Sequence, residues 1–342
     1  MPTMRAYRLL DWQHADFAEV PVPEPGPGEV RLRMAGVGLC HSDLHFLEAP
    51  AGAFPYAVPF TLGHENGGYV DALGPDASGL AEGDAVVAAG VHSCGRCDFC
   101  LRGHDNYCPL GVTGRGYGQD GGLAEFLVVP ARELVRLGTL DPVRAAPLTD
   151  AGSTSYHAVK KVLPKLVPGS TAVVIGAGGL GGYAVQYLRL LSAARVVAVD
   201  VAAHRLEFAR EVGAHEALTS DDTTAARLRE LTGGEGADAV FDFVGTDATM
   251  RLAFGAARTL GSVAIIGAAG GTVPVGWGAI PLECEVWIPM GATIADLREV
   301  IALAEQGALR IEVETFAFDE TATAYEQFAH GDLRSRAVVT IP

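Results

Sequence analysis

Four cysteines lie within fifteen residues of one another and have the spacing of a metal site: Cys94-x₂-Cys97-x₂-Cys100-x₇-Cys108. Zn²⁺ in structural sites prefers four tetrahedral ligands, and four thiolates leave no position open for water. The spacing therefore predicts a structural zinc site that fixes a loop with little apolar core of its own. A redox-active CxxC motif is the alternative, but such motifs lie beside a βαβ unit, whereas four cysteines share one loop here.

A second group of residues has the spacing of a dinucleotide-binding loop. The segment Gly176-Ala-Gly-Gly-Leu-Gly181 follows an apolar run and opens an amphipathic pattern. Gly176 allows a tight turn, Gly178 lets the backbone approach a pyrophosphate, and Gly181 permits close packing of helix against strand. The helix start adds unpaired N–H groups and a positive dipole end. We therefore expect the loop, including Gly179 and Leu180, to bind the phosphates of a dinucleotide.

An acidic residue at the end of the next expected strand bears on the choice of dinucleotide. Asp200 follows Gly181 by nineteen residues, and its carboxylate can accept hydrogen bonds from an adenosine ribose. Because a carboxylate would repel a 2′-phosphate, Asp200 favours NAD over NADP. Arg205 is close enough in the sequence to partner a phosphate, which qualifies this preference. Asp242 ends a later strand, where it either faces a ligand or makes structural hydrogen bonds.

The elements that must position these groups fall into two regions of different pattern. As far as Val129 the chain shows short β-type runs separated by turns, at residues 30–34, 68–73, 85–89 and 123–129. From about Asp150 strands and helices alternate, and the strands are almost continuously apolar, which is typical of a parallel sheet covered on both faces. Strands are expected over residues 171–176, 195–200, 237–244, 262–267, 284–288, 311–316 and 337–341. Helices are expected over residues 153–162, 179–191, 204–211, 224–231, 249–259, 294–305 and 320–328.

The composition excludes several classes of protein. The chain of 342 residues suggests two domains, and its net charge of −16 disfavours nucleic acid and anionic membranes as partners. The first ten residues lack the apolar stretch of a signal peptide, and the longest apolar run is interrupted by glycines, so we expect a cytoplasmic protein. Six cysteines in such a chain favour metal ligands over disulfides.

Two further segments supply a thiolate and an imidazole: Cys40-His-Ser-Asp-Leu-His45 and Gly63-His64-Glu65. With the four-cysteine spacing and the glycine loop, in the same order over essentially the whole chain, they resemble the zinc-dependent alcohol dehydrogenases of the medium-chain dehydrogenase/reductase family. The resemblance implies an α/β protein with a Rossmann doubly wound parallel sheet and a β-rich, GroES-like catalytic domain with a zinc lobe. Residues 1–150 and 292–342 would form the catalytic domain and residues 151–291 the dinucleotide-binding domain.

The resemblance also implies a second zinc, at a catalytic centre. The positions that hold it in the family fall here on Cys40, His64 and Asp150. The third position is most often cysteine, but carboxylate oxygen is an ordinary zinc ligand; a helix N-cap is the alternative role for Asp150. Glu65 is expected behind the metal or as a transient ligand, and Asp43 as the carboxylate that orients His64.

Further polar residues receive roles from the same resemblance. In the family a hydroxyl two residues after the first cysteine passes the proton of the alcohol through the cofactor ribose to a histidine, and these positions hold Ser42 and His45. His41 falls where the family often places a basic residue against the pyrophosphate. Thr154 and Arg336 fall at positions that contact the nicotinamide side of the cofactor.

We therefore expect an enzyme with two zinc ions per chain that transfers a hydride reversibly between NAD and a medium-sized, fairly apolar primary or secondary alcohol. Its partners would be small alcohols, aldehydes or ketones, and the chain would form a homodimer or homotetramer. A polyol dehydrogenase and a glutathione-linked aldehyde oxidase are alternative enzymes. A non-catalytic NAD-binding protein is a further alternative, although it predicts loss of a site residue and none is lost. The expected apolar lining consists of Phe54, Tyr56, Tyr117, Trp287 and Met290.

Overall fold

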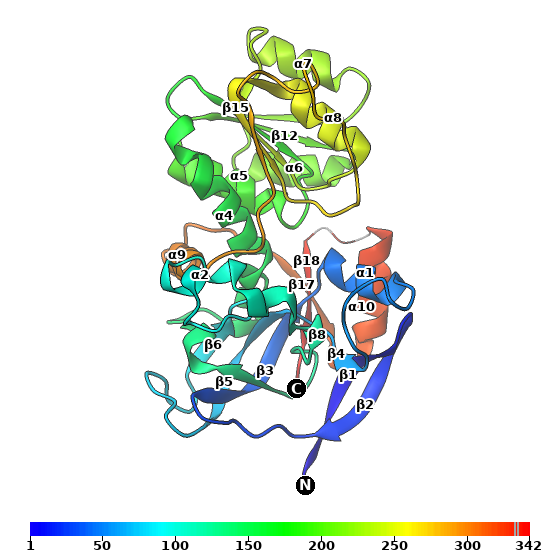
Figure 1. Ribbon diagram of the computed structural model, residues 1–342, viewed down its shortest axis with the longest axis vertical. Helices are drawn as coiled ribbons and strands as arrows, with labels where there is room; N and C mark the ends of the chain where they lie inside the picture. The colour runs from blue at the N-terminus through cyan, green and yellow to red at the C-terminus, as the bar shows by residue number, and fades with distance from the viewer. Residues whose placement is uncertain (332, 334) are drawn as a thin grey trace. The chain divides into compact units, whose positions relative to one another are not determined.

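The computed structural model describes residues 1–331, 333 and 335–342, and the chain divides into two compact units (Figure 1). Residues 1–153 and 291–342 form the first, which we call the β-rich unit. Residues 154–290 form the second, the α/β unit. No helix in the described part of the chain is both long and apolar enough to cross a membrane.

The α/β unit is built on a six-stranded parallel sheet in the order β13-β12-β11-β14-β15-β16. This order confirms the predicted doubly wound fold, in which all strands are parallel and the strand order reverses between β11 and β14. The residues of β11 and β14 are all buried, as expected for a sheet covered on both faces. The strands are β11 (Thr171–Ile175), β12 (Arg195–Asp200), β13 (Glu216–Thr219), β14 (Ala237–Asp242), β15 (Ala257–Ile265) and β16 (Glu285–Trp287).

Helices alternate with these strands and bury apolar faces against the sheet. They are α5 (Gly181–Leu191), α6 (Ala203–Glu211), α7 (Thr224–Leu231) and α8 (Asp247–Ala256); α4 (Ala151–Val162) starts in the β-rich unit and is followed by the 3₁₀ helix η5 (Leu163–Lys165). The helix expected over residues 249–259 is wrong at its end. Because Ala257 pairs with Ala237 of β14, the chain turns extended there, and the ladder overrides the helical pattern.

Cys284 also differs from the expectation of an ordinary core residue in a strand. It directly precedes β16, which is the edge of the sheet, and its side chain is only partly buried. Glu285 and Val286, the first two residues of β16, are exposed. An edge strand has one neighbour instead of two, so an apolar run in the sequence does not guarantee burial there.

Antiparallel sheets dominate the β-rich unit (Figure 1). The largest has the order β10-β6-β5-β3-β18-β17, with β9 also paired to β3, and a second sheet has the order β2-β1-β4. The strands are β1 (Thr3–Asp11), β2 (His14–Pro21), β3 (Glu29–Gly38), β4 (Phe60–Thr61), β5 (Glu65–Leu73), β6 (Ala85–Ala88), β7 (Gly114–Arg115), β8 (Gly118–Gln119), β9 (Phe126–Pro130), β10 (Leu134–Arg136), β17 (Val313–Ala317) and β18 (Arg336–Thr340).

Short helices link these sheets, and the first of them bears Ser42 and His45. The α-helices are α1 (His41–Glu48), α2 (Asp98–Leu101), α3 (Pro142–Ala145), α9 (Ile294–Glu305) and α10 (Thr321–His330). The 3₁₀ helices are η1 (Asp105–Tyr107), η2 (Pro109–Val112), η3 (Ala131–Glu133), η4 (Ala146–Thr149) and η6 (Phe318–Glu320). The unit's core packs around Leu32, Met34 and Leu62, which are fully buried.

Candidate metal centres and dinucleotide loop

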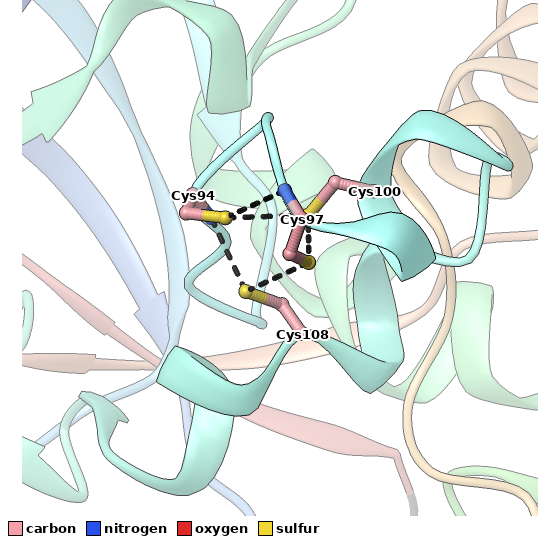
Figure 2. A group of neighbouring side chains, drawn as sticks. All are labelled: Cys94, Cys97, Cys100 and Cys108. Atoms are coloured by element: carbon pink, nitrogen blue, oxygen red, sulfur yellow. Dashed lines mark hydrogen bonds between the residues drawn. The ribbon is translucent and has the colours of Figure 1, made fainter.

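The four predicted cysteines meet in one lobe of the β-rich unit (Figure 2). The Sγ atom of Cys97 lies 3.4 Å from that of Cys100 and 3.9 Å from that of Cys108, and Cys94 and Cys100 are 4.0 Å apart. Four ligands each 2.3 Å from a tetrahedral zinc stand about 3.8 Å from one another. The donor set and its spacing therefore fit a zinc ion with four thiolate ligands.

The thiols of this lobe differ in how readily they ionise. Backbone N–H groups of Arg96 and Cys97 donate to the Cys94 sulfur and lower the pKa of Cys94 to about 6. Burial and the neighbouring Cys97 thiol raise the pKa of Cys100 to about 12. Four thiolates in contact need a cation to compensate their charge, and a divalent metal ion supplies it.

A second donor set unites three residues that are far apart in the sequence. Cys40 directly precedes α1, His64 directly precedes β5, and Asp150 lies between η4 and α4. The Asp150 Oδ2 atom lies 3.4 Å from the Cys40 sulfur and 3.6 Å from His64 Nε2. Cys40 and His64 are buried, whereas Asp150 is partly exposed. Sulfur, nitrogen and oxygen from three residues fit a zinc with a fourth position left for another ligand.

Asp43 orients two of these donors from behind. Its Oδ1 atom lies 3.1 Å from His64 Nδ1, and its Oδ2 atom accepts the backbone N–H of Cys40 at 3.0 Å. The carboxylate therefore directs the other imidazole nitrogen, Nε2, toward Cys40 and Asp150. Burial alone would lower the pKa of His64, but the Asp43 and Asp150 carboxylates outweigh it and hold the pKa well above its usual value.

Glu65 and Arg336 form a buried ion pair next to this centre. The Glu65 carboxylate accepts from the guanidinium Nε at 3.1 Å and from Nη2, and it also accepts the backbone N–H of Ala151 at the start of α4. Asp150 Oδ2 lies 3.9 Å from Arg336 Nη2. Burial raises the pKa of Glu65 to about 7 although Arg336 opposes the shift. The side chain predicted to contact the cofactor, Arg336, thus has a protein carboxylate as a partner.

Of the other residues predicted around the centre, one lies beside a metal-ligand candidate, two are exposed and one is buried in the α/β unit. Ser42 Oγ lies 3.7 Å from the Cys40 sulfur, so the structure brings this hydroxyl to the centre. His45 lies one helical turn further along α1 and is exposed. The ring of His41 is exposed and packs against Phe328 of α10, with ring centroids 4.5 Å apart. Thr154 is buried and belongs to the α/β unit.

The glycine loop has the backbone geometry that its sequence predicts. Gly176 has φ +85°, which favours glycine, and a Cβ atom on Gly181 would come within 1.9 Å of the Gly176 carbonyl oxygen. A Cβ atom on Gly178 would meet nothing closer than the Arg205 guanidinium at 4.0 Å. Leu180, which accepts the Ser155 hydroxyl through its carbonyl, directly precedes α5. The backbone at Gly178 therefore has room for a phosphate near the start of α5.

Asp200 lies at the carboxyl end of β12 and closes this loop. Its Oδ2 atom accepts the backbone N–H of Ala177 at 2.8 Å, and its Oδ1 atom accepts that of Ala202 at 2.9 Å. Arg205 Nη1 is 3.9 Å from Oδ1. Asp242 makes the corresponding turn bonds to Val244 and Gly245, and its Oδ2 atom is buried without a hydrogen-bond partner in the described structure.

The two centres and the loop together define a class of protein: an oxidoreductase with a zinc-binding, GroES-like unit and a dinucleotide fold. Residues 26–139 match the family model described as "Alcohol dehydrogenase GroES-like domain", and residues 179–305 match the one described as "Zinc-binding dehydrogenase". The chain belongs to the zinc-containing medium-chain alcohol dehydrogenase family.

Individual relatives agree with this assignment over nearly the full length. The NAD-dependent alcohol dehydrogenase of Sulfurisphaera tokodaii is 31% identical, with 98% of this chain and 99% of the relative covered. The D-arabinose 1-dehydrogenase (NADP(+)) of Saccharolobus solfataricus is 30% identical, with 94% and 93% covered. The crystal structure of the alcohol dehydrogenase from Aeropyrum pernix matches with a TM-score of 0.92 and 33% identity, covering 99% of this chain and 100% of that one.

Sequence reasoning missed several buried polar residues of the β-rich unit. It assigned no role to Arg115 and Glu133, whose side chains form a buried ion pair with a distance of 2.7 Å. It also did not pair Glu65 with Arg336. A charged residue inside an apolar strand pattern, as in Arg336-Ala-Val-Val339, is a signal that could have indicated burial with a partner.

We expect metal analysis of the purified protein to find two zinc ions per chain, because the two donor sets share no residue. Cys97→Ser removes one thiolate from the four-cysteine site, so this variant is expected to hold one zinc ion after excess metal is washed away. Inductively coupled plasma mass spectrometry measures the content. A wild-type protein with one zinc, or a Cys97→Ser variant with two, would contradict the assignment.

Proposed function

We propose that the protein is a zinc-dependent dehydrogenase that transfers a hydride between NAD and a medium-sized, fairly apolar alcohol, and that it also reduces the corresponding aldehyde or ketone. The observation that supports this most directly is the convergence of Cys40, His64 and the partly exposed Asp150 on one centre. When bound, a zinc ion there supplies Lewis acidity, which lowers the pKa of an alcohol hydroxyl and polarises a carbonyl.

In this proposal the protein's own residues hold the reactants and move the proton. Asp43 keeps His64 in the tautomer that presents Nε2 to the metal. Ser42, beside Cys40, accepts the proton of the substrate hydroxyl as it gives up its own hydroxyl proton, and His45, exposed one turn later, is the group that releases a proton to solvent. Glu65 pairs with Arg336 and thereby holds β18 and β5 in place around the centre. The proposal also includes contacts of the cofactor with Arg336, Thr154 and His41.

An apolar substrate is supported by aromatic rings that extend from His64. The ring centroid of Tyr117 lies 6.1 Å from that of His64, Tyr56 lies 6.4 Å from Tyr117, and Phe54 stacks on Tyr56 at 5.7 Å. Such rings offer apolar surface and few hydrogen bonds to a polyhydroxylated chain. The two other expected lining residues, Trp287 and Met290, belong to the α/β unit.

A sugar or polyol is the second candidate substrate, because one relative is named a D-arabinose 1-dehydrogenase. A substrate panel with NAD and with NADP, run before and after chelation, distinguishes the candidates. The proposal expects the highest kcat/KM for apolar alcohols with NAD, and loss of turnover after chelation. A preference for sugars would replace the substrate class, and turnover that survives complete metal removal would refute zinc dependence.

The proposal includes assembly into a homodimer or homotetramer. Within the described residues the outer edge of β16 has no partner strand. Exposed apolar side chains lie on both sides of this strand in the sequence: Val275 and Trp277 before it are 70% and 97% exposed, and Ile288 after it is 73% exposed. Exposed apolar surface beside an open sheet edge is typical of a protein–protein interface.

We expect Asp200→Ser to erode the preference for NAD. The substitution removes both the acceptor for the ribose hydroxyls and the charge that repels a 2′-phosphate, so the ratio of kcat/KM for NAD to that for NADP is expected to fall about tenfold or more. Asp222→Ser, at an exposed aspartate in the same unit, is the control and should leave the ratio unchanged. A wild-type enzyme that prefers NADP would show that Arg205 overrides Asp200.

A further inference from the structure

A buried carboxylate joins the four-cysteine lobe to the rest of the β-rich unit. Glu133 ends η3 and is fully buried. Its carboxylate accepts the backbone N–H of Ser93 at 2.8 Å and Arg115 Nη2 at 2.7 Å, and His92 Nδ1 lies 3.2 Å away. Burial alone would raise the pKa of Glu133, but His92, Arg115 and Ser93 outweigh it and lower the pKa. This carboxylate therefore stays ionised as a fixed point between chain segments.

The Glu133 carboxylate binds the residue at which the four-cysteine lobe begins. Ser93 directly precedes Cys94, so the bond from its N–H to Glu133 fixes the backbone from which the first thiolate projects. Arg132 fixes the same residue further by donating hydrogen bonds to the carbonyl and hydroxyl oxygens of Ser93. The position of the Cys94 thiolate is thereby tied to η3.

The Glu133 carboxylate also binds Arg115, in the segment that packs against His64. Arg115 also donates to the Ala89 carbonyl at 2.8 Å, and it lies two residues before Tyr117, whose hydroxyl donates to Gly90 at 3.0 Å. A Cβ atom on Gly116 would come within 2.7 Å of the Gly63 carbonyl carbon, so this loop lies directly on the backbone before His64. Arg115 therefore directly precedes a loop that lies against Gly63, the residue before His64.

We propose that Glu133 is a positioning residue that couples the two metal centres. A metal in the four-cysteine site would fix the positions of Cys94 and Ser93. Because Glu133 binds both Ser93 and Arg115, it would then also fix the position of Arg115. The loop around Gly116 and Tyr117 would in turn hold His64 in its metal-binding position. Binding at one centre consequently strengthens binding at the other, and the effect is reciprocal. The inference rests on the two metal sites of the proposed function.

The test measures metal binding, not turnover, with Co²⁺ exchanged into the Cys40–His64–Asp150 centre and zinc kept in the four-cysteine site. Glu133→Gln is expected to speed Co²⁺ release to a chelator about tenfold or more and to shift the visible spectrum of the bound ion. Asp71→Asn is the control, because it breaks a 2.7 Å ion pair to Arg31, between β5 and β3, without touching either centre. The control is expected to stay within about twofold of the wild type.

Three outcomes would overturn the inference. Glu133→Gln with wild-type release and spectrum would show that the carboxylate transmits nothing. Cys97→Ser, which empties the four-cysteine site, should speed release as much as Glu133→Gln, and the double variant should add little further; additive effects would mean that the paths are independent. If Glu133→Gln does not fold, Tyr117→Phe replaces it, and unchanged release from that variant would also refute the coupling. A wild-type protein that binds no second metal would instead refute the proposed function.

Discussion

Asp150→Asn is expected to lose one metal ion per chain and nearly all turnover while keeping the fold. Asparagine has the shape of aspartate but lacks its charge, so the centre would retain one anionic ligand, Cys40, instead of two. Removing an outer partner of a ligand typically costs about 10- to 100-fold in affinity or activity, and loss of a ligand should exceed the upper figure in kcat/KM. Metal analysis and steady-state kinetics measure the two losses.

Two comparisons make this result specific to metal binding. Asp150→Cys replaces one anionic zinc ligand with another, so it is expected to retain the metal and to release it more slowly than the wild type, since sulfur is the softer donor. NAD binding, followed by fluorescence quenching, should be unchanged in Asp150→Asn because the glycine loop belongs to the α/β unit. If Asp150→Asn keeps both zinc ions and its activity, Asp150 is a helix cap and Glu65 becomes the leading third ligand.

Glu65→Gln is expected to lower the free energy of unfolding by about 3–5 kcal/mol, because it removes the charge partner of a buried guanidinium. The Arg336 side chain is only 3% exposed, so water cannot replace the lost carboxylate. Asp150, with an oxygen 3.9 Å from Arg336, compensates part of the charge. Denaturant titration followed by far-ultraviolet circular dichroism, with and without metal, measures the change.

An exposed ion pair provides the comparison for this prediction. Arg195 and Glu216 are 2.9 Å apart, but both side chains are about 40% exposed, so Glu216→Gln should cost less than about 1 kcal/mol. A double variant, Glu65→Gln with Arg336→Met, also removes the unpaired guanidinium charge, so it should recover part of the lost free energy of unfolding. Equal stability of Glu65→Gln and the wild type would contradict this prediction.

The metal lobe and the dinucleotide loop could be predicted from the sequence because their geometry is local. Cys94, Cys97 and Cys100 are separated by two residues each, so a single tight loop brings their sulfur atoms together. Gly176 and Gly181 likewise meet within one strand–turn–helix connection, where the backbone needs positive φ and close approach. Apolar runs of strand length likewise predicted the parallel sheet, since such a sheet is buried on both faces.

The tertiary structure decided which charged groups pair in the interior. Glu65 and Arg336 are 271 residues apart, and they meet because β18 pairs with β3 and β3 with β5, which aligns Gly38 with Val338 on one side and with Glu65 on the other. The same holds for Glu133, which binds Ser93 and Arg115 from separate segments of the chain. Strand register over such separations is set by the whole core, and a buried charge takes whichever partner that register places beside it.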